Sequence, residues 1–199
     1  MTQASLADRD VAAVVIGASA GGVEALLEVL PAFRAGVRVA VFVVLHQPRD
    51  RMSLLPSIFA PKCALPVAEP DDKQDIDPGT IYFAPPDYHL LIEDGPRTAL
   101  SIDDLVHFSR PSIDILFESA ADVYGARLLA IVLSGGNEDG ADGAAFVRRA
   151  GGIVVVQDPA DAKVRTMPQF ALDRSGADFV LPLLQIAQLL STLEPGKPQ

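Results

Sequence analysis

Residues 11–22, VAAVVIGASAGG, set the architecture of this chain. A run of apolar, mostly β-branched residues ends abruptly in a glycine-rich turn. From Val23 to Leu30, apolar residues then recur at the i, i+3, i+4 and i+7 positions of a helix. The pattern predicts a strand, a tight turn and a helix in direct succession.

Ser19 lies inside this turn, in the segment GASAG of residues 17–21, which satisfies G-x-S-x-G. Its small neighbours let the backbone bend sharply and hold a serine hydroxyl clear of the end of the sheet. The first amides of the following helix and its positive dipole end would suit a developing oxyanion. The turn therefore indicates a nucleophilic serine. The competing interpretation is that Ser19 only caps the helix, as serine often does.

A second alternative is a dinucleotide site, because Gly17, Ser19 and Gly22 loosely match G-x-G-x-x-G. Such a site needs an acidic residue about 20 positions further on, at the end of the second strand. The second predicted strand, residues 38–45, is followed instead by His46. The histidine argues against a nucleotide site.

The composition is that of a globular protein. Of the 199 residues 49% are hydrophobic and 21% charged, and the formal net charge is −10. The acidic balance and the lack of a basic segment argue against nucleic acid as a partner. The apolar runs are too short for membrane insertion, and residues 1–10 do not resemble a signal peptide. Because Cys63 is the only cysteine, we expect no intrachain disulfide and a cytoplasmic location.

Predicted strands alternate with predicted helices along most of the chain. Residues 38–45, 127–133 and 153–156 are nearly unbroken apolar runs, which are typical of strands buried in a parallel sheet. Residues 80–84 and 89–92 are predicted to pair as a hairpin. We therefore predict an α/β fold: a doubly wound, mostly parallel sheet with helices on both faces and an antiparallel hairpin excursion.

The chain shows no internal repeat and no composition shift that would divide it. We predict a polar leader at residues 1–10, one domain at residues 11–193, and a polar tail at residues 194–199.

Polar residues directly follow three of the predicted buried strands, and they offer the parts of a catalytic triad. In open α/β sheets, ligands bind beyond the carboxyl ends of the strands. If the three strands are parallel and adjacent, Ser19, His46 and Asp139 would face one crevice. A serine nucleophile needs a base, and the base needs a carboxylate that orients it. These three residues could fill the three roles.

Other assignments stay open at this point. His89 and His107 are alternative bases, although neither directly follows a buried strand. Glu138 and Asp142 are alternative acids, Asp139 could cap its own helix, and His46 could be a structural histidine.

The acidic loop at residues 137–143 lacks the spacing and the closing glutamate of an EF-hand loop. No pattern of histidine and cysteine suits zinc. We therefore predict no metal site and no cofactor.

Together the motifs resemble those of the CheB family, the chemotaxis protein-glutamate methylesterases, in its catalytic domain. The resemblance runs from about Val11 to Leu193 and is specific because every piece occurs in order. The pieces are residues 15–22 (VIGASAGG), His46, residues 82–89 (YFAPPDYH), residues 110–114 (RPSID), residues 133–135 (LSG) with Asp139 and Gly140, and residues 157–159 (QDP) with Met167 and Pro168.

The resemblance implies a serine hydrolase that removes methyl groups from glutamate γ-methyl esters of chemoreceptor signalling helices and that also deamidates receptor glutamines. The expected partner is a methylated chemoreceptor or a related signalling protein. By motif matching, the nucleophile is Ser19, the general base and acid is His46, and the orienting carboxylate is Asp139.

The resemblance also implies residues on the substrate side of the same cleft: Ala20, Arg110, Gly136 and Asn137. The side chain of Arg110 could equally form a structural ion pair with Asp87 or Glu138.

Three departures from the family pattern bear on activity. Ala20 replaces the usual serine or threonine, Ser109 replaces the usual histidine, and residues 135–139 (GGNED) lack the usual methionine of a loop that shapes the oxyanion site. The sequence contains no receiver domain before the first strand, so we expect a free-standing catalytic domain. Two alternatives follow: a CheB-like binding module with little or no activity, or an esterase or amidase with a substrate other than a chemoreceptor.

Overall fold

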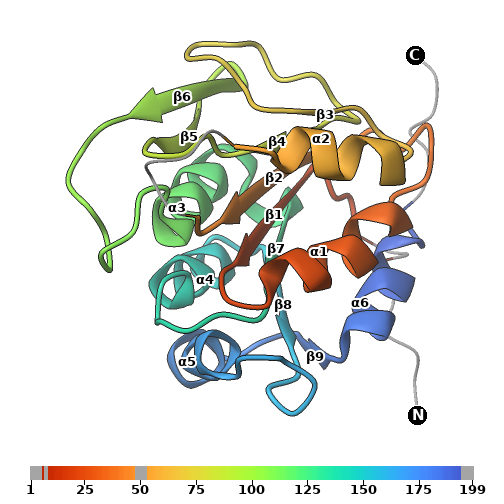
Figure 1. Cartoon of the computed structure of the whole chain (residues 1–199), viewed down its shortest axis with the longest axis vertical. Helices are drawn as coiled ribbons and strands as arrows, with labels where there is room; N and C mark the ends of the chain where they lie inside the picture. The colour runs from red at the N-terminus through yellow and green to blue at the C-terminus, as the bar shows by residue number, and fades with distance from the viewer. Residues whose placement is uncertain (1–5, 7–8, 48–52, 194–199) are drawn as a thin grey trace.

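The computed structural model describes residue 6, residues 9–47 and residues 53–193, which form three layers with helices on both faces of a central sheet (Figure 1). The strands are β1 (Ala13–Ala18), β2 (Ala40–Leu45), β3 (Val67–Ala68), β4 (Ile81–Phe83), β5 (His89–Glu93), β6 (Arg97–Ser101), β7 (Leu128–Val132), β8 (Ile153–Gln157) and β9 (Phe179–Leu181). The α-helices are α1 (Gly22–Val29), α2 (Leu55–Phe59), α3 (Ile113–Tyr124), α4 (Ala141–Arg149), α5 (Thr166–Ser175) and α6 (Leu183–Leu190), and the 3₁₀ helices are η1 (Leu30–Ala32), η2 (Ala60–Lys62) and η3 (Gly125–Arg127). None of these helices is long and apolar enough to cross a lipid bilayer.

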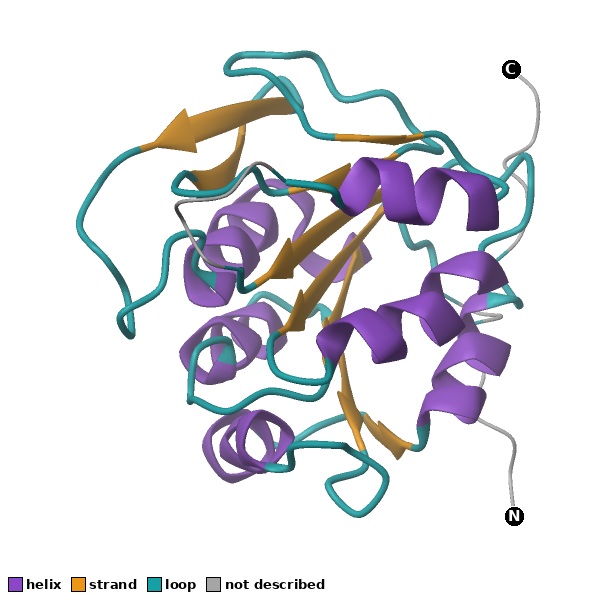
Figure 2. Cartoon of the chain, in the orientation of Figure 1, coloured by secondary structure: helices purple, strands orange, loops and turns teal. Residues whose placement is uncertain are grey.

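The central sheet has seven parallel strands in the order β3-β4-β2-β1-β7-β8-β9. β1 lies in the middle, and all six of its residues are buried. Its side chains alternate between two cores. Val14 and Ile16 pack in the core under α1 and α6, whereas Ala13 and Val15 pack in the core under α3 and α4. Figure 2 shows the helices on the two faces of the sheet. Burial on both faces explains the unbroken apolar runs, and the predicted doubly wound sheet is confirmed.

The antiparallel excursion exists, but its two strands are not the predicted pair. β4 is the predicted first strand, yet it pairs in parallel with β2 and β3 inside the central sheet. β5 instead pairs with β6 in a separate antiparallel hairpin. The physical reason is burial, since the three β4 residues are at most 1% exposed and need cover on both faces. The hairpin turn contains Gly95, whose φ of 83° suits glycine.

The buried face of α1 starts one residue earlier than the sequence pattern predicts. Val23 is 38% exposed, whereas the buried positions are Gly22, Ala25, Leu26 and Val29. Gly22 lets the helix approach the sheet closely, because a Cβ atom there would lie 2.6 Å from Leu45 Cδ1. This close contact fixes the start of the helix directly beside the Ser19 turn.

Candidate active site

The three predicted triad residues follow three adjacent strands. β1 pairs with β2 on one side and with β7 on the other, so their carboxyl ends meet at one edge of the sheet. Backbone hydrogen bonds continue past the strand ends: His46 N donates to Ala18 O at 3.1 Å, and Ser19 N donates to Ser134 O at 2.9 Å. The loops that carry Ser19, His46 and Asp139 are thereby held together.

The Ser19 side chain is not used as a helix cap. The N-cap position of α1 is occupied by Gly21, with a φ of 79° and no side-chain cap hydrogen bond. Ser19 O accepts a hydrogen bond from Gly22 N at 2.8 Å, which closes the turn. Among the described residues, the partly exposed Ser19 hydroxyl forms no hydrogen bond. The capping interpretation is therefore wrong, and the hydroxyl is free to react.

His46 is oriented by a carboxylate. Its Nε2 atom lies 2.9 Å from Asp139 Oδ2, and the two side chains are 13% and 0% exposed. Because a carboxylate only accepts hydrogen bonds, Nε2 carries the proton and Nδ1 is left as the nitrogen that can accept one. Ser19 forms no hydrogen bond to His46 here, and such bonds often tighten only when substrate is bound.

Asp139 is held by four donors. Besides His46, its carboxylate accepts hydrogen bonds from Ser112 Oγ at 2.8 Å, Ile113 N at 2.8 Å and Asp114 N at 3.0 Å. Asp139 thus caps α3, which belongs to another segment, and not its own helix α4. Burial alone would raise its pKa, but the hydrogen bonds from His46 and the two amides outweigh it and lower the pKa of Asp139.

The alternative bases are engaged elsewhere. His89 is fully buried, where its Nδ1 accepts a hydrogen bond from Ser112 N at 3.1 Å and its Nε2 donates to Asp104 O at 3.0 Å. The two ring nitrogens of His107 lie 3.3 Å from Asp114 Oδ2 and 3.3 Å from Glu138 Oε1. His89 is a structural histidine, and the two ring nitrogens of His107 face acids other than Asp139.

Arg110 lies at the same pocket as His46. The pocket is lined by His46, Gln47, Phe108, Ser109, Arg110 and Pro111. Of its two predicted structural partners, Arg110 pairs with Asp87: Nη2 and Nε lie 2.8 and 3.1 Å from Asp87 Oδ1. Its Nη1 donates to the carbonyl oxygens of Ile102 and Asp103. Most of the donors of Arg110 are therefore used within the chain.

The other predicted substrate-side residues lie outside the lining of this pocket. Ala20 is exposed, and its carbonyl accepts a hydrogen bond from Ser134 Oγ at 2.7 Å. Gly136 is exposed with open space around it. Asn137 is partly buried, and its buried Oδ1 atom has no hydrogen-bond partner within the described part of the chain. A role of these three residues in substrate binding stays a prediction.

Sequence reasoning missed two serines that build the site. Ser134 ties the turns together, because its carbonyl accepts from Ser19 N while its hydroxyl donates to Ala20 O and accepts from Val164 N. Ser112 is the N-cap of α3 and also donates to Asp139. The signal for Ser112 was present, since it precedes a helix and follows a proline.

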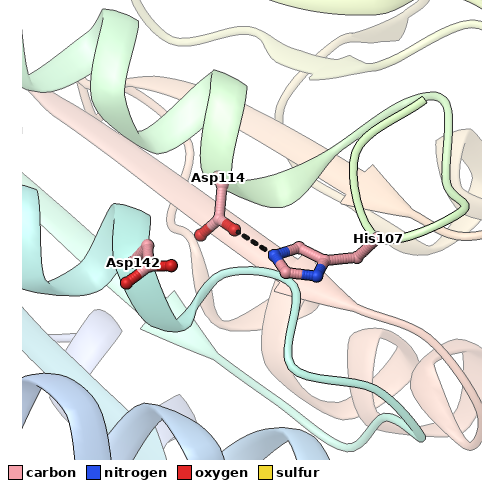
Figure 3. Close-up of side chains that lie close together, drawn as sticks. All are labelled: His107, Asp114 and Asp142. Atoms are coloured by element: carbon pink, nitrogen blue, oxygen red, sulfur yellow. Dashed lines mark ion pairs between the residues drawn. The ribbon is translucent and has the colours of Figure 1, made fainter. Parts of the chain in front are cut away.

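One described cluster brings together side chains that could ligate a metal: His107, Asp114 and Asp142, whose ligand atoms all lie within 4.8 Å of one another (Figure 3). Each of them already has a protein partner. Asp142 pairs with Arg174 at 3.2 Å, and Asp114 Oδ1 accepts two backbone hydrogen bonds. The cluster is accounted for by ion pairs and hydrogen bonds.

The model of the CheB methylesterase family matches residues 14–190. A Leptospira interrogans protein with the provisional name protein-glutamate methylesterase/protein-glutamine glutaminase is 40% identical, over 92% of this chain and 94% of its own. A Methanosarcina mazei protein-glutamate methylesterase/protein-glutamine glutaminase is 37% identical over 87% of this chain, and the match spans about half (49%) of that protein.

The fold leads to the same family. The crystal structure of the Thermotoga maritima CheB methylesterase catalytic domain superposes with a TM-score of 0.87 at 31% identity, covering 92% of this chain and 99% of that one. Sequence and structure agree over nearly the same residues. This chain belongs to the CheB methylesterase family.

Proposed function

We propose that this protein is a serine hydrolase that cleaves glutamate γ-methyl esters on the signalling helices of a chemoreceptor. Ser19 is the nucleophile, His46 the general base and acid, and Asp139 the orienting carboxylate. The observation that carries this proposal is the 2.9 Å hydrogen bond from His46 Nε2 to the fully buried Asp139, at the strand end adjacent to Ser19. Relatives named protein-glutamate methylesterase support the choice of substrate.

In the first half of the reaction, Ser19 Oγ attacks the ester carbonyl carbon while His46 Nδ1 takes the hydroxyl proton. Asp139 stabilises the imidazolium that forms. The tetrahedral intermediate collapses as His46 passes its proton to the methoxy oxygen, which leaves as methanol. Ser19 is then acylated by the glutamyl side chain.

In the second half, His46 Nδ1 removes a proton from a water molecule that attacks the acyl carbon. The second tetrahedral intermediate collapses, the proton returns to Ser19 Oγ, and a glutamate side chain is released. A glutamine side chain would follow the same path with ammonia as the leaving group. The names of the relatives include protein-glutamine glutaminase, so we propose deamidation as a second activity of the same site.

The oxyanion donors would be backbone amides of the Ser19 turn. Ser19 N and Gly22 N are already used, by Ser134 O and Ser19 O. Among the described residues, Ala20 N and Gly21 N form no hydrogen bond, so both are free to bind the oxyanion. One such donor contributes about 10²- to 10³-fold to kcat. Because the donor is the backbone N–H group, alanine at position 20 keeps the same donor that a serine or threonine would supply.

The test is methanol release from a methylated chemoreceptor by the wild-type protein and by Ser19→Ala, with Ser191→Ala, at the C-cap of α6, as the matched control. We expect Ser19→Ala to abolish turnover and Ser191→Ala to keep it. Equal rates for the wild type and Ser19→Ala would remove Ser19 from the mechanism. A folded protein that no active-site serine probe labels would instead favour a CheB-like binding module.

The substrate needs its own measurement. Activity on small methyl esters without activity on methylated receptor would favour an esterase with a different natural substrate. A cytoplasmic location and a chemoreceptor as partner stay predictions.

A further inference from the structure

The backbone amides at the N-terminal ends of α3 and α4 each donate hydrogen bonds to a carboxylate from the other segment. Asp139, which precedes α4, accepts hydrogen bonds from the amides of Ile113 and Asp114 in α3. Asp114 returns the interaction: its Oδ1 atom accepts from Gly140 N at 2.9 Å and from Gly143 N at 2.7 Å, at the start of α4. Asp139 thus caps α3, and Asp114 of α3 caps α4.

We propose that Asp114, supported by His107, is a positioning residue for the hydrolase reaction: it fixes the backbone that carries Asp139 and so keeps His46 oriented toward Ser19. This inference rests on the proposed function of the same site. Asp114 does not touch the reacting atoms and acts only through Asp139.

The route from Asp114 to the catalytic carboxylate is short. Gly140 directly follows Asp139, and its left-handed φ of 95° means that the chain turns sharply at the residue that Asp114 holds. The helices are also in close contact, because a Cβ atom on Gly143 would lie 3.0 Å from Asp114 Cα. Asp114 and Asp139 are 5% and 0% exposed, so water cannot readily replace these hydrogen bonds. A change at Asp114 should therefore move Asp139.

His107 contacts both Asp114 and the loop that carries Asp139. Figure 3 shows its ring directed at Asp114, and His107 Nε2 lies 3.3 Å from Asp114 Oδ2. The other ring nitrogen lies 3.3 Å from Glu138 Oε1, in the loop that carries Asp139. His107 and the next residue, Phe108, adopt positive φ angles of 48° and 61°, which are uncommon for residues other than glycine. The loop thus holds an unusual backbone conformation with this ring placed between two acids.

The charged groups around Asp114 come from every neighbouring element. Asp139 and Glu138 belong to the loop before α4, Asp142 belongs to α4 and pairs with Arg174 of α5, and His107 belongs to the loop before α3. Burial first, and the charge of Asp139 second, raise the pKa of Asp114 to about 7, while Gly143 N and His107 act in the opposite direction. Near neutral pH, Asp114 therefore changes between a neutral and a charged form beside the catalytic carboxylate.

The isosteric variant Asp114→Asn separates hydrogen-bond acceptance by this side chain from its ionisation. Asparagine at position 114 keeps an oxygen that can accept from Gly140 N and Gly143 N, but it cannot ionise. Alanine loses the oxygen as well. We expect Asp114→Ala to lower kcat by about 10- to 100-fold with KM changed by less than about threefold, because a small displacement of a catalytic group costs rate more than binding. Asp114→Asn should recover most of that loss.

The matched control is Asp122→Asn, an exposed acid on the same helix, which should keep the wild-type kcat. The ratio of kcat/KM for the wild type to that for Asp114→Asn should change between pH 6 and pH 8. A folded Asp114→Ala variant with wild-type kcat, an Asp114→Asn variant as impaired as alanine, or a ratio constant over this pH range would each overturn the proposal.

A measurement without substrate separates this inference from the proposed function. In ¹⁵N-histidine NMR spectra, the hydrogen-bonded Nε2 proton of His46 should be present in the wild type and Asp114→Asn and be lost or shifted upfield in Asp114→Ala. An unchanged signal in Asp114→Ala would contradict the inference whether or not the protein cleaves esters. If Asp114→Ala does not fold, His107→Gln is measured instead. This substitution should alter the pH profile of kcat/KM in the wild type but not in an Asp114→Asn background. Equal effects in both backgrounds would overturn the coupling between His107 and Asp114.

Discussion

His46 Nε2 lies 2.9 Å from Asp139 Oδ2, although the two residues are 93 positions apart in the chain. They are brought together because β2 and β7 flank β1 in the same parallel sheet. The carboxylate is held independently by Ser112 Oγ and by two amides of α3. The position of the imidazole therefore depends on a carboxylate that three other donors fix in place.

Replacing Asp139 by asparagine should reduce kcat by about 10³- to 10⁴-fold while leaving substrate affinity nearly intact. The side-chain amide of asparagine can donate a hydrogen bond to His46, which favours the tautomer with the wrong nitrogen protonated. The measurement is the rate of methanol release at substrate saturation, with Asp122→Asn as the control for surface charge. A loss smaller than about tenfold would mean that Asp139 does not orient the base.

The stability of the protein should fall as the pH rises toward neutrality because of Asp114. Its folded-state pKa of about 7 lies above the ordinary value of 3.8, so between these values the folded state binds a proton that the unfolded state has released. At 1.36 kcal/mol per unit, the free energy of unfolding should lose up to about 4 kcal/mol from this group between pH 4 and pH 7 and stay level above.

Urea unfolding of the wild type and of Asp114→Asn at pH 5, 6, 7 and 8 checks this expectation. The wild type should lose stability relative to Asp114→Asn as the pH rises. Asp139 contributes with the opposite sign, because its folded-state pKa is lowered, and its contribution is lost only as the pH falls below about 4. A difference between the two proteins that does not depend on pH would show that Asp114 does not titrate in this range.

Arg110 can be tested as a substrate-binding residue by separating it from its structural partner. Arg110→Ala should raise KM by about tenfold or more, since a hydrogen bond to a charged group is worth about 1.5–3 kcal/mol. Asp87→Asn removes only the negative partner and leaves the guanidinium at the pocket lined by His46. This variant should change KM much less. Equal increases in KM for the two variants would indicate that Arg110 acts only by holding the loop together.

Local sequence patterns were sufficient for the architecture. Strands buried on both faces must be apolar at every position, so β1, β2, β7 and β8 stand out as unbroken runs in the sequence. The glycines beside Ser19 mark the turn because only a small residue fits where α1 meets the sheet, as the contact between Gly22 and Leu45 shows. The order of short motifs along the chain then pointed to the family and to the three triad residues.

Tertiary structure alone decided which distant segments meet. The sequence predicted β4 and β5 as a hairpin, but β4 joins the central sheet because both of its faces need cover. The sequence also left open whether Asp139 caps its own helix, whereas in the structure the carboxylate caps α3 and orients His46. Hydrophobic periodicity records whether a residue is buried, but not which partner buries it. Hydrogen-bond partners such as Asp114 with Gly140, or Arg110 with Asp87, depend on how whole elements pack, and that information is spread over the entire chain.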